Sequence, residues 1–124
     1  MGMTNYGLAL AASALNSSAT VATYVGCGTG TASESAAHPH LDTEITDSGL
    51  ARVVGTVSTV TTTVAGDTSQ WVYTWTASGS KTIAEVGVAN GSSGEKFIAK
   101  SALSASRSLL SGDTFTLTYK IVHA

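Results

Sequence analysis

The amino-acid sequence predicts a mainly β protein, an antiparallel β-sandwich or jelly-roll-like domain with one short N-terminal helix and a long irregular arm. Beyond residue 50, β-branched and aromatic residues recur in short runs separated by Gly, Ser, Asn and Asp. For the whole chain we expect seven or so strands with turns at short intervals, which is typical of a sandwich or a barrel-like roll. At 124 residues the chain has the length of one domain, so we expect residues 1–124 to share a single core.

The first segment, residues 1–17, predicts a short helix. Asn5 is placed to cap its N-terminus, and an apolar stripe follows at the i, i+3, i+4, i+7 spacing of a helix face: Leu8, Ala11, Ala12 and Leu15. The polar residues 16–18 end the pattern. Because the apolar side chains are small, we expect this helix to lie against a sheet.

The next segment, Gly26 to Leu50, predicts a glycine-rich arm because it shows no strand pattern. Loops of this length in a small domain are usually functional. Its first three glycines do not fit a dinucleotide-binding loop, since the third comes one position early and no convincing helix follows: Gly26, Gly28 and Gly30. We expect these glycines to end a strand and to permit the close approach of another backbone.

Two imidazoles and two carboxylates lie close together in the same arm, at His38, His40, Asp42 and Glu44. All four are possible metal ligands, but no second cluster in the sequence offers the remaining ones. We therefore expect an exposed polar loop with no metal and no cofactor. The residues that we expect to contact a partner are Gly26, Gly28, Gly30, His38, His40, Asp42 and Glu44.

Residues 51–124 are expected to form the sheet core. The β runs of the chain are residues 20–26, 51–64, 70–77, 81–89, 96–103 and 114–122. In the last run the apolar residues alternate with Thr and Lys, so one face is expected to point inward: Phe115, Leu117, Tyr119 and Ile121. The connection at residues 90–95 contains an Asn-Gly pair, which tolerates the positive φ of a hairpin turn.

Three aromatic residues, Trp71, Tyr73 and Trp75, share one face of a predicted strand. We expect them to fill the core or an oligomer interface, because the chain has few other bulky side chains. An exposed row could instead stack on sugar rings, which would make the chain a carbohydrate-binding module. Glu85 interrupts an apolar run, and a half-buried carboxylate there predicts an ion pair with Arg52 or Arg107.

The composition excludes several classes of function. Only 11% of the residues are charged, against about a quarter in an ordinary domain, and six basic residues make no patch for nucleic acid. The 19 Thr and 17 Ser residues give an uncharged polar surface that suits contact with other copies. The single cysteine, Cys27, is typical of a reducing compartment. No apolar run is long enough to span a bilayer, and residues 7–15 lack the preceding basic segment of a secretory signal.

Catalysis is not expected either, because no nucleophile motif occurs and no acid or base is marked by its context. Instead, the motifs TN.G, GTGT, L.TEI with a later Arg, EVGV and GDTFTLTY are similar to those of small virion proteins of tailed bacteriophages. These are often labelled decoration or tail-fibre components. The matching positions are Thr4-Asn5, Gly7, Gly28 to Thr31, Leu41, Glu44-Ile45, Arg52, Glu85 to Val88 and Gly112 to Tyr119.

This resemblance implies a non-enzymatic structural protein of the virion, assembled in the cytoplasm of the host bacterium. The expected role is that of a capsid decoration or cement protein, which binds phage capsid protein as a homotrimer and bridges capsid subunits. A tail-fibre or baseplate component, bound to other tail proteins, is the alternative. The sequence shows no long fibre region, and this favours the decoration role.

Overall fold

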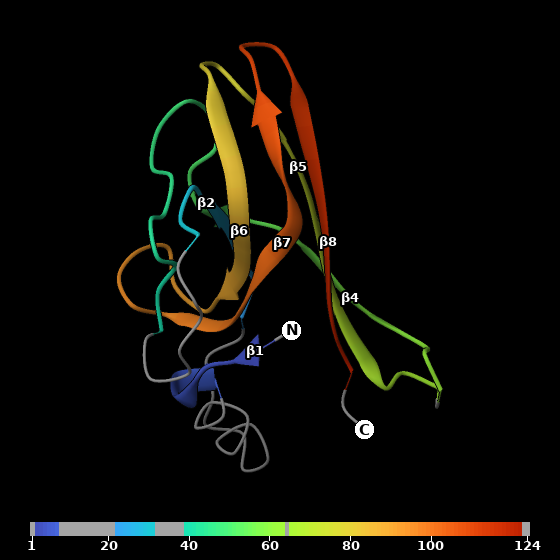
Figure 1. Cartoon of the computed structure of the whole chain (residues 1–124). Coiled ribbons are helices and arrows are strands. Elements are labelled where there is room, and N and C mark those ends of the chain that lie inside the picture. The colour runs from blue at the N-terminus through green and yellow to red at the C-terminus, as the bar shows by residue number, and fades with distance from the viewer. Residues whose placement is uncertain (1, 8–21, 32–38, 64, 123–124) are drawn as a thin grey trace.

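Two antiparallel sheets face each other and form a β-sandwich, as the sequence predicts (Figure 1). The computed structural model describes residues 2–7, 22–31, 39–63 and 65–122. The larger sheet, sheet A, has the strand order β1 (Gly2–Met3), β7 (Phe97–Leu109), β6 (Lys81–Ala89), β2 (Tyr24–Gly28) and β3 (Val53–Val54). The smaller sheet, sheet B, has the order β4 (Thr56–Val60), β5 (Thr68–Thr76) and β8 (Thr114–Val122).

Among the described strands, the chain crosses between the sheets at three connections: β3–β4, β5–β6 and β7–β8. The β5–β6 and β7–β8 connections meet at one end of the sandwich (Figure 1). There the amide of Ala77 donates to the carbonyl of Asp113 at 2.8 Å, and the amide of Gly112 donates to the carbonyl of Ala77 at 2.7 Å. Gly112 has a φ of 94°, a conformation that an L side chain rarely adopts. These bonds tie the two crossings together.

The third crossing divides the predicted run of residues 51–64, so the expectation of one strand there is wrong. β3 belongs to sheet A and β4 to sheet B, with Gly55 between them. A side chain at Gly55 would lie 3.2 Å from the carbonyl of Val72 and 3.3 Å from the side chain of Val25, one from each sheet. Glycine therefore fits where the chain passes between the two packed layers.

Aromatic side chains of sheet B fill the space between the sheets. Trp71 is opposite Tyr119 in the register, and Trp75 is opposite Phe115, with their rings stacked at 5.9 Å between centroids. The indole N–H of Trp71 donates to Ala22 O at 2.8 Å. The prediction that Trp71 and Trp75 lie in the core is confirmed, since they are 4% and 2% exposed, and Tyr73 packs against the same core. The prediction that the alternate apolar residues of the last strand face the core is confirmed as well.

Strand β6 is buried on both faces, from Ile83 to Ala89. One face meets sheet B. The other face is covered by residues 39–50, whose apolar side chains are inside the protein: Leu41, Ile45 and Leu50. The arm predicted over residues 26–50 is irregular at residues 39–50, as expected, but it does not project: residues 26–28 belong to β2, and residues 39–50 form a packed layer. Residues 32–38 are outside the described part.

The N-terminal segment differs from the prediction at its start. Gly2 and Met3 form a strand that pairs with β7, and helical geometry begins at Asn5. The cap is Thr4 and not Asn5, because the Thr4 hydroxyl accepts a bond from the amide of Gly7 at 2.9 Å. The same hydroxyl is 2.7 Å from the carbonyl of Phe97 and can donate to it, which ties the cap to β7. The remaining residues of the predicted helix, 8–17, are outside the described ranges.

We predict that Trp75→Ala lowers the free energy of unfolding by about 3–5 kcal/mol, because it removes a ring that is almost fully buried between the sheets. Urea denaturation followed by circular dichroism measures this change. Thr76→Ala, at the exposed neighbouring position, is the control and is expected to change stability by no more than about 0.5 kcal/mol. Equal stabilities of the two variants would contradict the packing described here.

Candidate functional site

The glycines at the start of the predicted arm lie against residues 42–45 of the same chain. Gly28 forms an antiparallel bridge with Glu44, and the amide of Thr29 donates to the carbonyl of Thr43 at 2.9 Å. A side chain on Gly28 would meet the Thr43 carbonyl at 2.5 Å, and one on Gly30 would meet the Asp42 side chain. The expected close approach of another backbone is therefore confirmed, and that backbone belongs to this chain.

Glu85 holds this layer in place through hydrogen bonds to backbone amides. Its side chain projects from β6 and is 7% exposed. One carboxylate oxygen accepts from the amide of Asp42 at 2.8 Å. The other oxygen accepts from the amides of Gly30 at 3.0 Å and Thr43 at 2.7 Å. Amide donors around a carboxylate make strong, charge-assisted bonds, so Glu85 is satisfied without a cation. The predicted ion pair with Arg52 or Arg107 is wrong.

Arg52 instead forms a bidentate ion pair with Glu44, at 2.7 and 2.9 Å. The guanidinium also donates to the carbonyls of Gly91 and Gly94 at 3.0 Å, and it lies 4.4 Å above the Phe97 ring. This arginine lines a shallow hollow of about 300 Å³. Because four of its N–H groups already have partners, the charge of the hollow is neutralised from within the chain.

The predicted contact residues come together on the outer face of sheet A, but most of them are not accessible. Gly26, Gly28 and Gly30 are buried, so the expectation that they contact a partner is wrong. Glu44 is engaged by Arg52. Asp42 is exposed, and His40, with 43% of its side chain exposed, lies 3.7 Å from Glu95. His38 is outside the described residues. Within those residues no three His, Cys, Asp or Glu side chains gather as a metal site would require.

The single cysteine is sealed inside the core. Cys27 is fully buried, and its Sγ lies 3.3 Å from the carbonyl of Leu50. Burial raises the pKa of the Cys27 thiol to about 12, and the charges of Glu44 and Glu85 act in the same direction. The thiolate is the reactive form of cysteine, so this side chain is inert at neutral pH.

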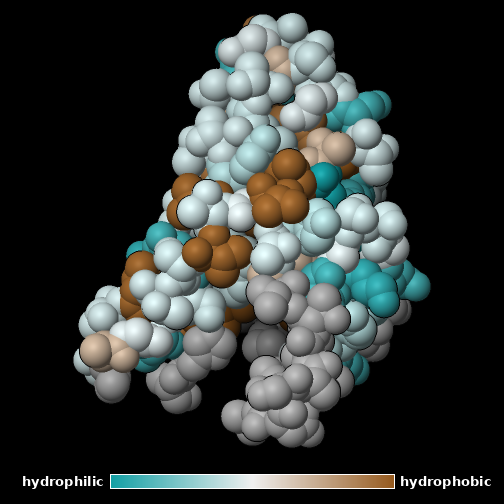
Figure 2. All heavy atoms as spheres, turned by 180° about the vertical axis from the view of Figure 1, so that it is seen from behind, coloured by the Kyte–Doolittle hydropathy of each residue, from teal (hydrophilic) through white to brown (hydrophobic). Residues whose placement is uncertain are grey.

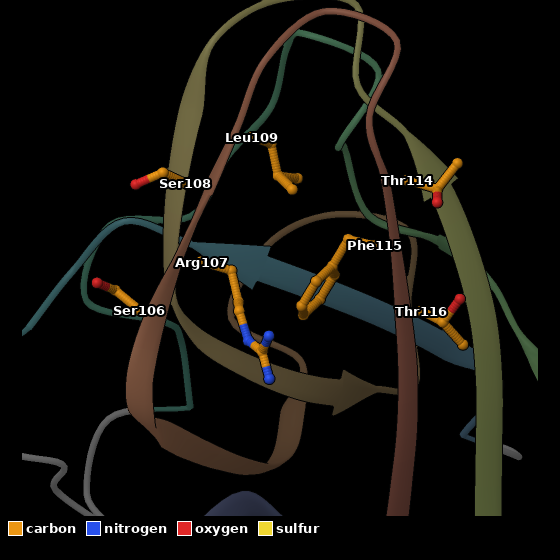
Figure 3. A pocket seen from close by; sticks show the side chains of 7 residues that line it. All are labelled: Ser106, Arg107, Ser108, Leu109, Thr114, Phe115 and Thr116. Carbon is orange, nitrogen blue, oxygen red and sulfur yellow. The ribbon is translucent and has the colours of Figure 1, made fainter.

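A groove that sequence reasoning missed lies between β7 and β8, on one open side of the sandwich (Figure 3). It has a volume of about 440 Å³, within the range of ligand sites. Arg107 and Leu109 of β7 and Phe115 of β8 point into it, whereas the Ser and Thr side chains on its walls point away. No sequence signal marks this groove, because it exists only where two strands of different sheets both lie at an edge.

The comparisons with known proteins do not assign the chain to a family. No protein-family model matches the sequence, and no curated protein is significantly similar to it. In the described part of the chain, no helix has both the length and the hydrophobicity needed to cross a membrane.

We predict that Glu85→Gln destabilises the protein by about 1–3 kcal/mol, because an amide NH₂ would replace an acceptor oxygen and leave a buried backbone N–H without a partner. Thermal and urea unfolding measure the change. Glu95→Gln, which removes an exposed carboxylate, is the matched control and is expected to be almost neutral. If both variants were as stable as the wild type, the proposed importance of Glu85 for the outer layer would be wrong.

A second prediction concerns alkaline pH and Cys27. The pKa of the folded thiol is raised, so the unfolded chain ionises first, and the thiol reduces the stability of the fold as the pH rises from 9.0 toward about 12. Cys27→Ala lacks this group. The difference in free energy of unfolding between wild type and variant should therefore shrink across this range, as measured by urea titrations at several pH values. A constant difference would contradict the burial of the thiol.

Proposed function

We propose that this chain is a non-enzymatic structural protein of a bacteriophage particle, a capsid decoration or cement protein that acts as a homotrimer. The observation that carries this proposal is the set of exposed strand edges. Within the described residues, β4 and β8 each pair with β5 alone, so that both edges of sheet B have backbone groups without strand partners. An edge of this kind is a template for pairing with another chain.

The outer face of sheet B supports the same proposal. Six threonines from three strands share this face: Thr56, Thr74, Thr76, Thr114, Thr116 and Thr118. The hydroxyls of Thr74 and Thr116 are hydrogen-bonded across the strands at 2.8 Å. Uncharged hydroxyls can be covered by another protein without the desolvation cost of buried ions. Figure 2, seen from behind relative to Figure 1, shows hydrophobic side chains among pale, weakly polar ones.

The environments of the ionisable and nucleophilic side chains also favour an adhesive role over catalysis. Glu85, Glu44 and Arg52 bind to groups of the chain itself, and Cys27 is buried in its neutral form. A catalytic acid, base or nucleophile must reach a substrate. These groups are used for internal cohesion, and the contact surfaces are backbone edges and hydroxyls.

The proposed mechanism is adhesion to the assembled shell. The protein is made in the cytoplasm of the host bacterium, and its trimers then bind the phage capsid protein and bridge neighbouring capsid subunits. Each contact adds buried area between subunits and so raises the resistance of the head to internal pressure. Beyond the strand edges, this proposal relies on the similarity of the sequence motifs to small virion proteins.

Two other functions are less well supported. A tail-fibre or baseplate component would use the same exposed edges and is the second candidate. A carbohydrate-binding module was suggested by the aromatic row, but Trp71 and Trp75 are buried between the sheets and Tyr73 packs beside them. The row cannot act as an open platform for sugar rings while the sandwich is folded.

We predict that a density map of the phage particle places this protein on the capsid shell, in groups of three copies. Sedimentation of the purified protein should show the same trimer. Density at the tail tip would instead support the second candidate function, a tail-fibre or baseplate component. A protein that stays monomeric in solution and is missing from the particle would contradict the proposal.

A further inference from the structure

The groove between β7 and β8 has the features of a binding site for an extended peptide. Both of its walls are strand edges. β8 pairs with β5 on one side only, and beyond residue 102 β7 pairs with β6 on one side only, among the residues that the structure describes. In an antiparallel pair about half of the amide and carbonyl groups of an edge strand point away from its partner. An added strand would satisfy these groups along β8.

Two apolar side chains point into the groove, whose exposed lining is otherwise mostly polar. Phe115 and Leu109 point into the groove from opposite walls (Figure 3). Leu110, which follows β7 and does not line the groove, is 65% exposed and is the most exposed of the large apolar residues described. A strand bound here would place alternate side chains against Leu109 and Phe115, as in other cases of strand addition.

The charge of the groove specifies the occupant further. Arg107 is exposed, its guanidinium points into the groove, and it forms no ion pair with any described residue. Arg52, by contrast, is neutralised by Glu44. An arginine in a partly apolar groove favours a carboxylate, which it can bind through two parallel hydrogen bonds.

The wall formed by β7 leaves room for such a strand. The register of β6 and β7 shifts between Ile83 and Glu85, so that residues 103–106 of β7 bulge away from the ladder. The exposed side chains on this wall are small apart from Arg107: Ser104, Ala105, Ser106 and Ser108. Residues 103–109 include no proline and no lysine, the residue types that protect many natural sheet edges from pairing with another strand.

We infer that the β7–β8 groove is the docking site for the capsid: an extended, acidic segment of the capsid protein adds to β8 as a fourth strand of sheet B, with a carboxylate on Arg107. This inference rests on the proposed function and names the part of the molecule that performs it. It assigns the specificity of the contact to Arg107 and its affinity to the backbone of β8, with Leu109 and Phe115 as its apolar contacts.

The test uses full-length protein and particles of the encoding phage that were assembled without it. Wild type, Arg107→Glu and Lys120→Glu are mixed with these particles, and the bound fraction is measured by co-sedimentation. Arg107→Glu should bind more weakly by about tenfold or more, because a carboxylate would then face a carboxylate. Lys120→Glu makes the same charge change on the outer face of β8 and should bind within about twofold of the wild type.

Hydrogen exchange on the wild type provides the second measurement, independent of any variant. Binding to particles should slow exchange of the alternate amides of β8 that point away from β5, because they become hydrogen-bonded to the added strand.

Each of the other possible results contradicts a specific part of the proposal. If the wild type does not bind particles, the decoration function and the docking site both fall. If wild type and Arg107→Glu bind equally, the docking site is wrong while the decoration function stands. If binding leaves exchange along β8 unchanged, strand addition is wrong. If the same amides become protected in concentrated protein without particles, the occupant is a second copy of this chain.

Discussion

The outer layer of this fold depends on the hydrogen bonds that the carboxylate of Glu85 accepts. β6 is the central strand of sheet A and is covered on both faces, so a charged side chain on it must find partners inside the protein. Three backbone amides supply them, from Gly30, Asp42 and Thr43. The glycines of β2 make the same contact possible, because side chains at those positions would keep the layer away from the sheet. The glycines therefore let the layer approach the sheet, and the carboxylate holds it there.

Two strands were predicted with their correct bounds, β6 and β8. β6 is a run of mostly apolar residues between two turn signals, whereas β8 has one face on the core and one exposed face, which gives strict alternation. Trp71 and Trp75 were placed correctly for the same reason. The run at residues 51–64 was misjudged because β-branched residues look alike in either sheet, and only Gly55 marks the crossing.

The outer layer and the groove could not be predicted from residue patterns. Residues 39–50 bury apolar side chains at irregular intervals, so neither the helical nor the strand period reveals Leu41, Ile45 and Leu50. The partners of Glu85 are backbone groups, which every residue carries, and a search for a charged partner therefore leads to the wrong answer. The groove at Arg107 follows from which strands lie at the edges of the two sheets, and that is a property of the topology alone.

The three crossings between the sheets have a consequence for how the chain reaches its folded state. In the part of the chain that the structure describes, three of the six ladders join segments that are distant in the sequence: β1 with β7, β2 with β6 and β5 with β8. The entropy of closing these long loops is lost before the contacts form, which slows folding to the millisecond-to-second range that is usual for sandwiches. Neither sheet has a complete ladder until the chain has crossed to the other layer and returned. The two sheets are therefore expected to fold and unfold as one cooperative unit, and the edges of sheet B become ordered only when the whole domain is formed.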